Sequence, residues 1–385
     1  MNNTKHGGPV SLYLHFPFCE RKCRYCDFLS GPAEEETREE YISLLCREIE
    51  LRTAEVPACV DTIFIGGGTP SLMTPEQAER LMQTVHRSFN VMDNAEISME
   101  VNPGTADLTK LRAYKAAGIN RLSIGVQSFD DDELKLLGRI HTAKQARQIF
   151  LMAREAGFAN INLDLMSALP GQNIDTWSKT LREAVILSPD HISAYSLIIE
   201  DGTPFAAMQL PELPSEEEDR RMYHYTREFL AENGYRRYEI SNYARENFEC
   251  RHNCGYWTGH QYLGLGLGAS SDLAGERFRN PDQISIYRTL ITNQNISALH
   301  CERQKMTQND RMEEFMFLGL RMTDGVSERE FEERFGIKLE AQFGDILRKH
   351  LSQNLICRTT KDGGRIALTE YGMDVANYVM SDYLL

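Results

Sequence analysis

Three cysteines near the start of the chain are spaced in a way that suits a metal cluster. They are Cys19, Cys23 and Cys26, in the segment Cys-Glu-Arg-Lys-Cys-Arg-Tyr-Cys. A short loop with these gaps can wrap around a [4Fe–4S] cube and offer thiolates to three of its irons, which leaves the fourth iron open for a small chelating ligand. A zinc site, or three unrelated cysteines, is the alternative. The spacing differs, however, from the paired C-x-x-C units typical of zinc.

Other residues suited to ligand binding follow the ends of predicted strands. Residues 66–70, Gly-Gly-Gly-Thr-Pro, come directly after a strand, and glycines there let backbone groups approach a ligand's amino group. Glu100, Gln127 and Asp164 lie at or near the ends of three later strands, and Arg139 lies a little further on. A carboxylate suits ribose hydroxyls, and an arginine suits a carboxylate. Each signal alone is weak, but together with the cysteine loop they predict one shared site.

Strands and helices must alternate to bring these residues together. Short runs rich in Ile, Leu and Val predict strands at 11–16, 61–65, 95–101, 120–126, 160–166 and 191–198. Helical segments are predicted at 34–55, 75–89, 108–117, 130–156, 174–188 and 214–233. This alternation indicates parallel βα units. Because six units are fewer than the eight of a closed barrel, we predict an α/β fold with a partial, TIM-like (β/α)6 barrel.

After residue 235 the regular alternation of predicted strands and helices stops. We predict a barrel over residues 1–235, an extension and linker over 236–305, and a winged-helix-like α+β module over 306–385. The Gly-rich segment 262–268 is more typical of close backbone packing in an extended segment than of a nucleotide loop. The last module is predicted from helices at 311–321, 327–334 and 339–353 and from a hairpin at 355–359 and 365–369. It is too weakly basic to indicate DNA binding, so a docking or structural role is favoured.

The composition is that of a folded protein and excludes several classes. Lys and Arg number 42 against 56 Asp and Glu, a net charge of −14 that argues against non-specific binding to nucleic acid or anionic membranes. No apolar run approaches the roughly 18–20 residues of a membrane span, and residues 1–10 lack a signal-peptide pattern. We therefore expect a cytoplasmic protein that meets membranes only through its partners. Nine cysteines, an odd number, fit metal chemistry better than disulfides there.

The cysteine motif, with Tyr25 before its last member, resembles the radical S-adenosylmethionine superfamily. In that superfamily the methionine moiety chelates the open iron, and an electron from the reduced cluster can break the sulfonium C–S bond. Nearly the whole chain further resembles the oxygen-independent coproporphyrinogen III oxidase family, through segments 13–19, 66–70, 100–103, 123–128 and 164–166. The resemblance implies that Cys19, Cys23 and Cys26 ligate the cluster. It also implies cofactor-binding roles for Tyr13, Tyr25, Gly67, Gly68, Thr69, Glu100, Gln127, Arg139, Asp164 and, with less support, Ile198.

Two departures point to a sister group within that family, the HemW heme chaperones. The decarboxylating enzymes carry a fourth cysteine where this chain has Phe28, and they have a longer segment before the first strand. Residues 252–257 also read His-Asn-Cys-Gly-Tyr-Trp, the H-N-x-x-Y-W motif of that group. Imidazole is a good axial ligand for heme iron, and aromatic rings can stack on a porphyrin. The resemblance thus implies heme binding by His252, Tyr256 and Trp257, although a lone histidine is usually structural.

We therefore expect a heme chaperone that carries a [4Fe–4S] cluster and S-adenosylmethionine and passes heme to acceptor hemoproteins, with respiratory hemoproteins as candidates. We expect it to lack coproporphyrinogen dehydrogenase activity. The alternatives are an oxygen-independent coproporphyrinogen III oxidase and an enzyme of radical chemistry on another tetrapyrrole. Cys250 and Cys254 flank His252 as a second ligand set or, more typically, as small buried residues. The oligomeric state stays open, a homodimer included.

Overall fold

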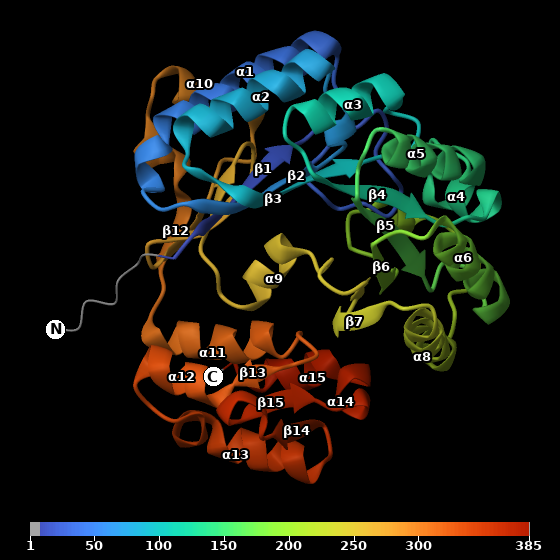
Figure 1. Cartoon of the computed structure of the whole chain (residues 1–385), viewed down its shortest axis with the longest axis vertical. Helices are drawn as coiled ribbons and strands as arrows, with labels where there is room; N and C mark the ends of the chain where they lie inside the picture. Colours follow the sequence, from blue (N-terminus) through green and yellow to red (C-terminus); the bar gives the residue numbers. More distant parts are fainter. Residues whose placement is uncertain (1–7, 385) are drawn as a thin grey trace.

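The computed structural model describes residues 8–384 of the chain. It shows a large sheet wrapped by helices and, beside it, a smaller body that carries the C-terminus (Figure 1). The sequence expectation for the N-terminal segment falls partly on residues 1–7, which lie outside the described residues. Within the described part of the chain, no helix has the length and apolar character needed to cross a membrane.

Six parallel strands form the centre of the large sheet, as predicted. They are β1 (Val10–Phe16), β2 (Val60–Gly67), β3 (Val91–Val101), β4 (Arg121–Gln127), β5 (Asn160–Ser167) and β6 (His191–Ser196). Each pairs in parallel with the next. Helices cover the outer face: α1 (Glu35–Leu51), α2 (Pro75–Ser88), α3 (Leu108–Ala116), α4 (Asp131–Leu137), α5 (Ala143–Glu155), α6 (Ile174–Leu187) and α8 (Glu216–Glu232) (Figure 1). The apolar strand residues pack against these helices in one core, which confirms the partial (β/α)6 barrel.

Short strands extend the sheet at both edges. β7 (Arg236–Glu239) and β8 (Asn242–Ala244) continue it beyond β6, and β9 (Tyr262–Leu265), β10 (Ser270–Leu273), β11 (Glu276–Arg279) and β12 (Cys301–Lys305) continue it beyond β1. β9 runs parallel to β1. A Cβ on Gly264 would lie 2.1 Å from the carbonyl oxygen of Ser270, so this strand needs glycine. The Gly-rich segment is therefore close-packed extended backbone, as expected, and α10 (Ile284–Thr292) follows it.

The C-terminal body contains the predicted helices and hairpin. They are α11 (Gln308–Gly319), α12 (Glu328–Phe335), α13 (Leu339–Ser352), β14 (Ile356–Thr359) and β15 (Arg365–Leu368). Three elements were not predicted: β13 (Val326–Ser327), which pairs with β15, and the short helices α14 (Glu370–Asp374) and α15 (Ala376–Ser381). The apolar residues of this body form a cluster separate from the barrel core. We propose a domain boundary near residue 306 on that ground.

Some predicted boundaries were wrong, for local reasons. The helical segment 130–156 is two helices, because Gly138 ends α4 in the left-handed region with φ 75° and Thr142 begins α5 with a capping box. The first helix ends at Leu51 rather than at 55. β6 ends at Ser196, so Ile198 lies in the loop beyond the strand rather than at its end.

Candidate functional site

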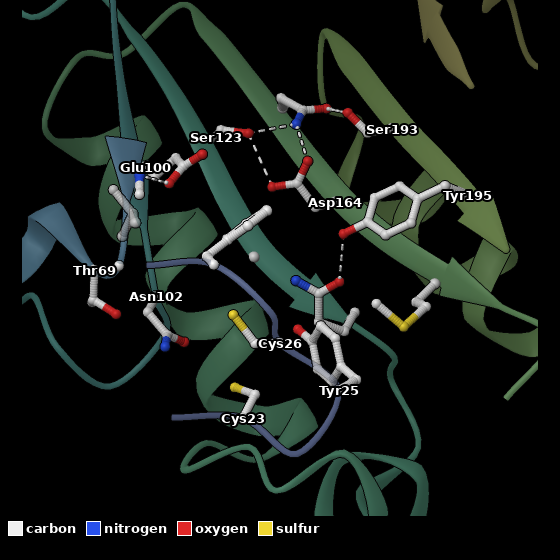
Figure 2. Close-up of a pocket in the computed structure, with 18 of the residues that line it drawn as sticks. Cys23, Tyr25, Cys26, Thr69, Glu100, Asn102, Ser123, Asp164, Ser193 and Tyr195 are labelled. Atoms are coloured by element: carbon white, nitrogen blue, oxygen red, sulfur yellow. Dashed lines mark hydrogen bonds between the residues drawn. The ribbon is translucent and has the colours of Figure 1, made fainter. Parts of the chain in front are cut away.

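A cavity of about 570 Å³ occupies the inside of the partial barrel. Inward-facing side chains of β1–β6 form its walls, and the loop 17–31, which carries the cysteines, covers the carboxyl ends of the strands. Figure 2 shows Cys23, Cys26, Glu100 and Asp164 around the same space. Every predicted site residue except Trp257 lines the cavity: Tyr13, Cys19, Cys23, Tyr25, Cys26, Gly67, Gly68, Thr69, Glu100, Gln127, Arg139, Asp164, Ile198, His252 and Tyr256.

The three cysteines lie in a loop braced by its own backbone. The Cys19 N–H donates to the Gly31 carbonyl at 2.9 Å, and the Cys26 N–H donates to the Cys23 carbonyl at 3.3 Å. Arg139 donates from Nη1 to the Cys23 sulfur at 3.3 Å, which ties the loop to the segment after α4. Burial raises the pKa of the Cys26 thiol. A bound metal cluster would offset that burial cost, because it stabilises the deprotonated sulfur.

The three thiols line the same cavity, but their sulfurs are not arranged as the ligands of a metal site in this conformation. Across residues 8–384, no group of three or more His, Cys, Asp and Glu side chains is arranged to hold a metal ion. Cys23 and Cys26 are only half-buried and lie on a turn. Rotation about their χ1 angles therefore moves the sulfurs without moving a strand. The loop fits a [4Fe–4S] cluster on the condition that the thiols turn toward one another.

The glycine motif after β2 supports the start of the cysteine loop. Gly67 has φ +115°, and a Cβ there would lie 2.5 Å from the ring of His15. A Cβ on Gly68 would lie 2.6 Å from the carbonyl oxygen of Phe18, which accepts the Thr69 N–H at 2.8 Å. Both approaches require glycine. The motif thus packs the end of β2 directly against the segment that leads into the cysteines.

Two buried carboxyl groups face the cavity from β3 and β5. Glu100 accepts the Gly67 N–H at 3.0 Å, and Asp164 accepts hydrogen bonds from Ser123 at 3.0 Å and Asn162 at 2.7 Å (Figure 2). Burial and the neighbouring Asp164 raise the pKa of Glu100 to about 8, and burial raises the pKa of Asp164. A cationic ligand would favour the ionised acids. The pair is therefore suited to an ammonium group or to ribose hydroxyls.

Arg139 and Gln127 join neighbouring strands beneath the cysteine loop. The Nη2 of Arg139 donates to Asn102 Oδ1 and to the Gly125 carbonyl. Its Nε is buried without a hydrogen-bond partner within the described residues, which leaves one donor for a ligand. Gln127 ends β4 with φ 66°, a left-handed conformation uncommon for a side-chain-bearing residue, and accepts the Tyr195 hydroxyl at 3.1 Å. Backbone strain of this kind is found most often at ligand-binding sites.

The helix α9 (Arg251–Trp257) brings the predicted heme residues to the opposite end of the strands. His252 is 1% exposed, with Nδ1 2.8 Å from Thr62 Oγ1 and Nε2 3.0 Å from the Tyr256 hydroxyl. Burial lowers the pKa of His252 to about 3, so its ring is neutral at neutral pH. Trp257 lies outside the cavity, with the Arg321 guanidinium 4.3 Å from its ring centroid. His252 and Tyr256 therefore line the cavity without Trp257, and both ring nitrogens of His252 already have hydrogen-bond partners in this conformation.

Several cavity residues were missed in the sequence. Arg121 and Asn162 line the walls from strands that otherwise contain apolar runs. Polar side chains inside such runs were the available signal, because a parallel strand is normally apolar on both faces. Tyr25 packs near Phe205, with 6.5 Å between ring centroids, so part of its role is structural. Ile198 is 70% exposed at the rim, which is a weak position for a cofactor contact.

Comparisons with known proteins fit this geometry. Residues 13–184 match the family model of the Radical SAM superfamily, and residues 306–375 match that of the HemN C-terminal domain. A Bacillus subtilis protein named heme chaperone HemW is 37% identical over 97% of this chain and 99% of its own length. The chain belongs to the HemW family. The superfamily to which HemW proteins belong implies a [4Fe–4S] cluster and S-adenosylmethionine.

Other relatives agree with the HemW assignment. A Haemophilus influenzae protein of the same name is 34% identical over 98% of both chains, and one from Escherichia coli is 40% identical over 68% of this chain and 69% of its own. The solved structure of Escherichia coli coproporphyrinogen III oxidase (HemN) covers 98% of this chain and 90% of its own, with a TM-score of 0.85 and 24% identity. That likeness supports the fold, a radical SAM barrel followed by a C-terminal module.

The raised pKa of Glu100 predicts how this HemW chain loses stability with pH. The folded protein keeps Glu100 protonated up to about pH 8, whereas an unfolded glutamate releases its proton near 4.5. The contribution of protonated Glu100 to the free energy of unfolding is therefore complete below pH 4.5. It declines as the pH rises toward 8, by at most about 1.4 kcal/mol per pH unit. Urea unfolding at pH 6 and pH 8 should show a larger loss in the wild type than in Glu100→Gln. Equal losses would contradict the raised pKa.

Proposed function

We propose that the chain binds a [4Fe–4S] cluster through Cys19, Cys23 and Cys26 and holds S-adenosylmethionine beside it. The observation that carries this proposal is the convergence of the thiols, the glycine motif and the two buried carboxyls on one cavity. When bound, such a cluster supplies an electron for cleavage of a sulfonium C–S bond. The chain itself contributes binding, orientation and burial of the ligand.

The side chains of the cavity have distinct proposed tasks. Glu100 and the carbonyl groups near Gly67 would hold the ammonium group of the ligand, and Asp164 would accept hydrogen bonds from ribose hydroxyls. Arg139 would donate its free Nε to the ligand carboxylate. Tyr13, Tyr25, Gly68, Thr69, Gln127 and Ile198 complete the proposed set of contacts.

We further propose that the chain is a heme chaperone, which binds heme and passes it to acceptor hemoproteins. Relatives named heme chaperones align over nearly the whole chain, and the motif at 252–257 is present. Thr62 donates its own hydroxyl proton to Ser11, so it accepts from Nδ1–H of His252. The Nε2 lone pair is then held by the Tyr256 hydroxyl. Iron ligation by His252 would have to displace that hydroxyl.

Hemin titration of purified protein tests this assignment with two variants that predict opposite results. His252→Ala should lose the Soret shift and weaken binding by at least about tenfold, because the imidazole proposed to hold the iron is gone. Tyr256→Phe keeps the aromatic ring but frees Nε2, so hemin affinity should stay or rise. His86→Ala, which changes an exposed histidine on α2, should bind like the wild type.

Two outcomes would contradict the chaperone proposal. Hemin binding that is unchanged in His252→Ala would remove the ligand role from this residue. Anaerobic turnover of coproporphyrinogen III by reconstituted protein would instead support the enzyme alternative.

A further inference from the structure

A buried arginine at the floor of the cavity has far fewer partners than donors. Arg121 begins β4, is 2% exposed and lines the cavity. Within the described residues its guanidinium makes one side-chain hydrogen bond, from Nη1 to Ser98 Oγ at 3.4 Å, and its Nε has no partner. A guanidinium carries five N–H donors, and unpaired buried donors are costly. This cation is therefore placed to receive a ligand anion.

The acids nearest to Arg121 give their hydrogen bonds to other groups. Glu96 holds the start of α9: its Oε1 accepts the His252 N–H at 3.1 Å, and its Oε2 accepts the Arg251 N–H at 3.0 Å. Asp164 is bonded to hydroxyl and amide groups of β4 and β5. These acids add negative charge beside the guanidinium without using its donors. The floor therefore suits one added negative charge rather than two.

The surroundings of Arg121 combine amides with aromatic rings. Asn242, 8% exposed, and Asn253 line the cavity. The Asn242 amide already donates to Glu239 Oε1 at 2.6 Å, and its unpaired atom is the acceptor Oδ1, so the amide donor for a ligand anion is that of Asn253. The ring of His252 lies 5.2 Å from that of Phe64 and 5.0 Å from that of Tyr256, and all three line the cavity. A guanidinium with a neighbouring amide N–H can bind a carboxylate, and an aromatic wall accepts a flat apolar body.

We propose that the floor of the barrel is a second binding subsite, which takes a small organic monocarboxylate. Its carboxylate pairs with Arg121, and its apolar body packs against Phe64 and Tyr256. Arg121 lies at the opposite end of β4 from Gln127, and Asp164 is the proposed S-adenosylmethionine contact nearest to it. Arg121 opens β4 and Gln127 ends it, so roughly 20 Å of strand lies between their backbones.

Calorimetric titration of the full chain, without cluster or heme, tests the subsite with benzoate as the probe. Saturable benzoate binding is expected, with at least about tenfold weaker binding of the neutral benzamide and of the sulfate dianion. Arg121→Met should weaken benzoate binding by a similar factor. Arg47→Met is the control and should retain it, because that arginine is 45% exposed on α1 and does not line the cavity.

Four results would each contradict the proposed subsite: no saturable benzoate binding, equal binding of benzamide, tighter binding of sulfate, or an equal loss of binding in Arg47→Met. If circular dichroism shows that Arg121→Met does not fold, Asn253→Asp decides instead. It adds a negative charge from a half-buried position on the same floor, and unchanged benzoate binding would then reject the proposal. Because the titration needs neither cluster nor heme, its failure leaves the proposed function untouched.

Discussion

Replacing any one of Cys19, Cys23 and Cys26 with serine is expected to remove most of the iron that the chain can bind. A serine hydroxyl stays protonated at neutral pH and is a poor ligand for iron in a sulfur cluster, whereas each cysteine supplies one of only three proposed protein ligands. Loss of even an outer-shell partner costs about 10–100-fold in metal affinity, so loss of a ligand should cost at least as much. Iron, sulfide and visible absorbance after anaerobic reconstitution measure the effect.

Two cysteines elsewhere in the chain provide matched controls. Cys59 is exposed and accepts a hydrogen bond from Asn90, and Cys357 lies on β14 of the C-terminal body. Neither lines the cavity. Serine at these positions should leave the iron and sulfide content of the wild type. Full cluster content in Cys23→Ser, or equal losses in the controls, would show that the loop 17–31 is not the ligand loop.

Replacing Arg52 with alanine is expected to destabilise the barrel by about 3–5 kcal/mol, the range for breaking a buried ion pair. Glu48 on α1 and Arg52, the residue that follows the last turn of this helix, are fully buried and pair at 2.9 Å. Glu48 also accepts the Tyr287 hydroxyl at 2.6 Å and the Gly266 N–H at 2.7 Å, which ties α1 to α10 and to the residue that follows β9. Without the guanidinium, the Glu48 charge stays buried with no cation against it. Urea unfolding followed by circular dichroism reports the change.

The same helix offers the control for that measurement. Arg47 pairs with Glu50 at 3.1 Å, but both side chains are 45% exposed, so Arg47→Ala should cost less than about 1 kcal/mol. The double variant Glu48→Gln, Arg52→Met removes both charges and should lose less stability than Arg52→Ala alone. A change below about 1 kcal/mol in Arg52→Ala would mean that the buried pair contributes little to the barrel.

Much of the fold is predictable from the sequence, because each parallel strand is an apolar run that a helix of period 3.6 must cover. The edge strands were not predicted as such, because β7 to β12 are mostly four residues long and carry no clear alternation. The single predicted helix over 130–156 failed for a different reason. Gly138 lies inside an otherwise helical pattern, and its left-handed backbone became evident only in the structure.

Part of the candidate site was likewise predictable from the sequence, and part was not. Cys19, Glu100 and Asp164 were predicted to share a site because they follow the ends of parallel strands, where ligands bind in such sheets. Arg121 and His252 lie near the beginnings of the strands, and spacing alone could not show what surrounds them. Their burial depends on α9 closing the floor of the barrel, a contact between segments more than a hundred residues apart.

The most direct measurement is the electron paramagnetic resonance spectrum of the reduced, reconstituted protein before and after addition of S-adenosylmethionine. A [4Fe–4S] signal whose g values change on addition is the predicted result, because the ligand would occupy the one iron that the three cysteines leave open. A metal analysis that finds zinc and no iron, or a cluster signal that the ligand leaves unchanged, would contradict the account.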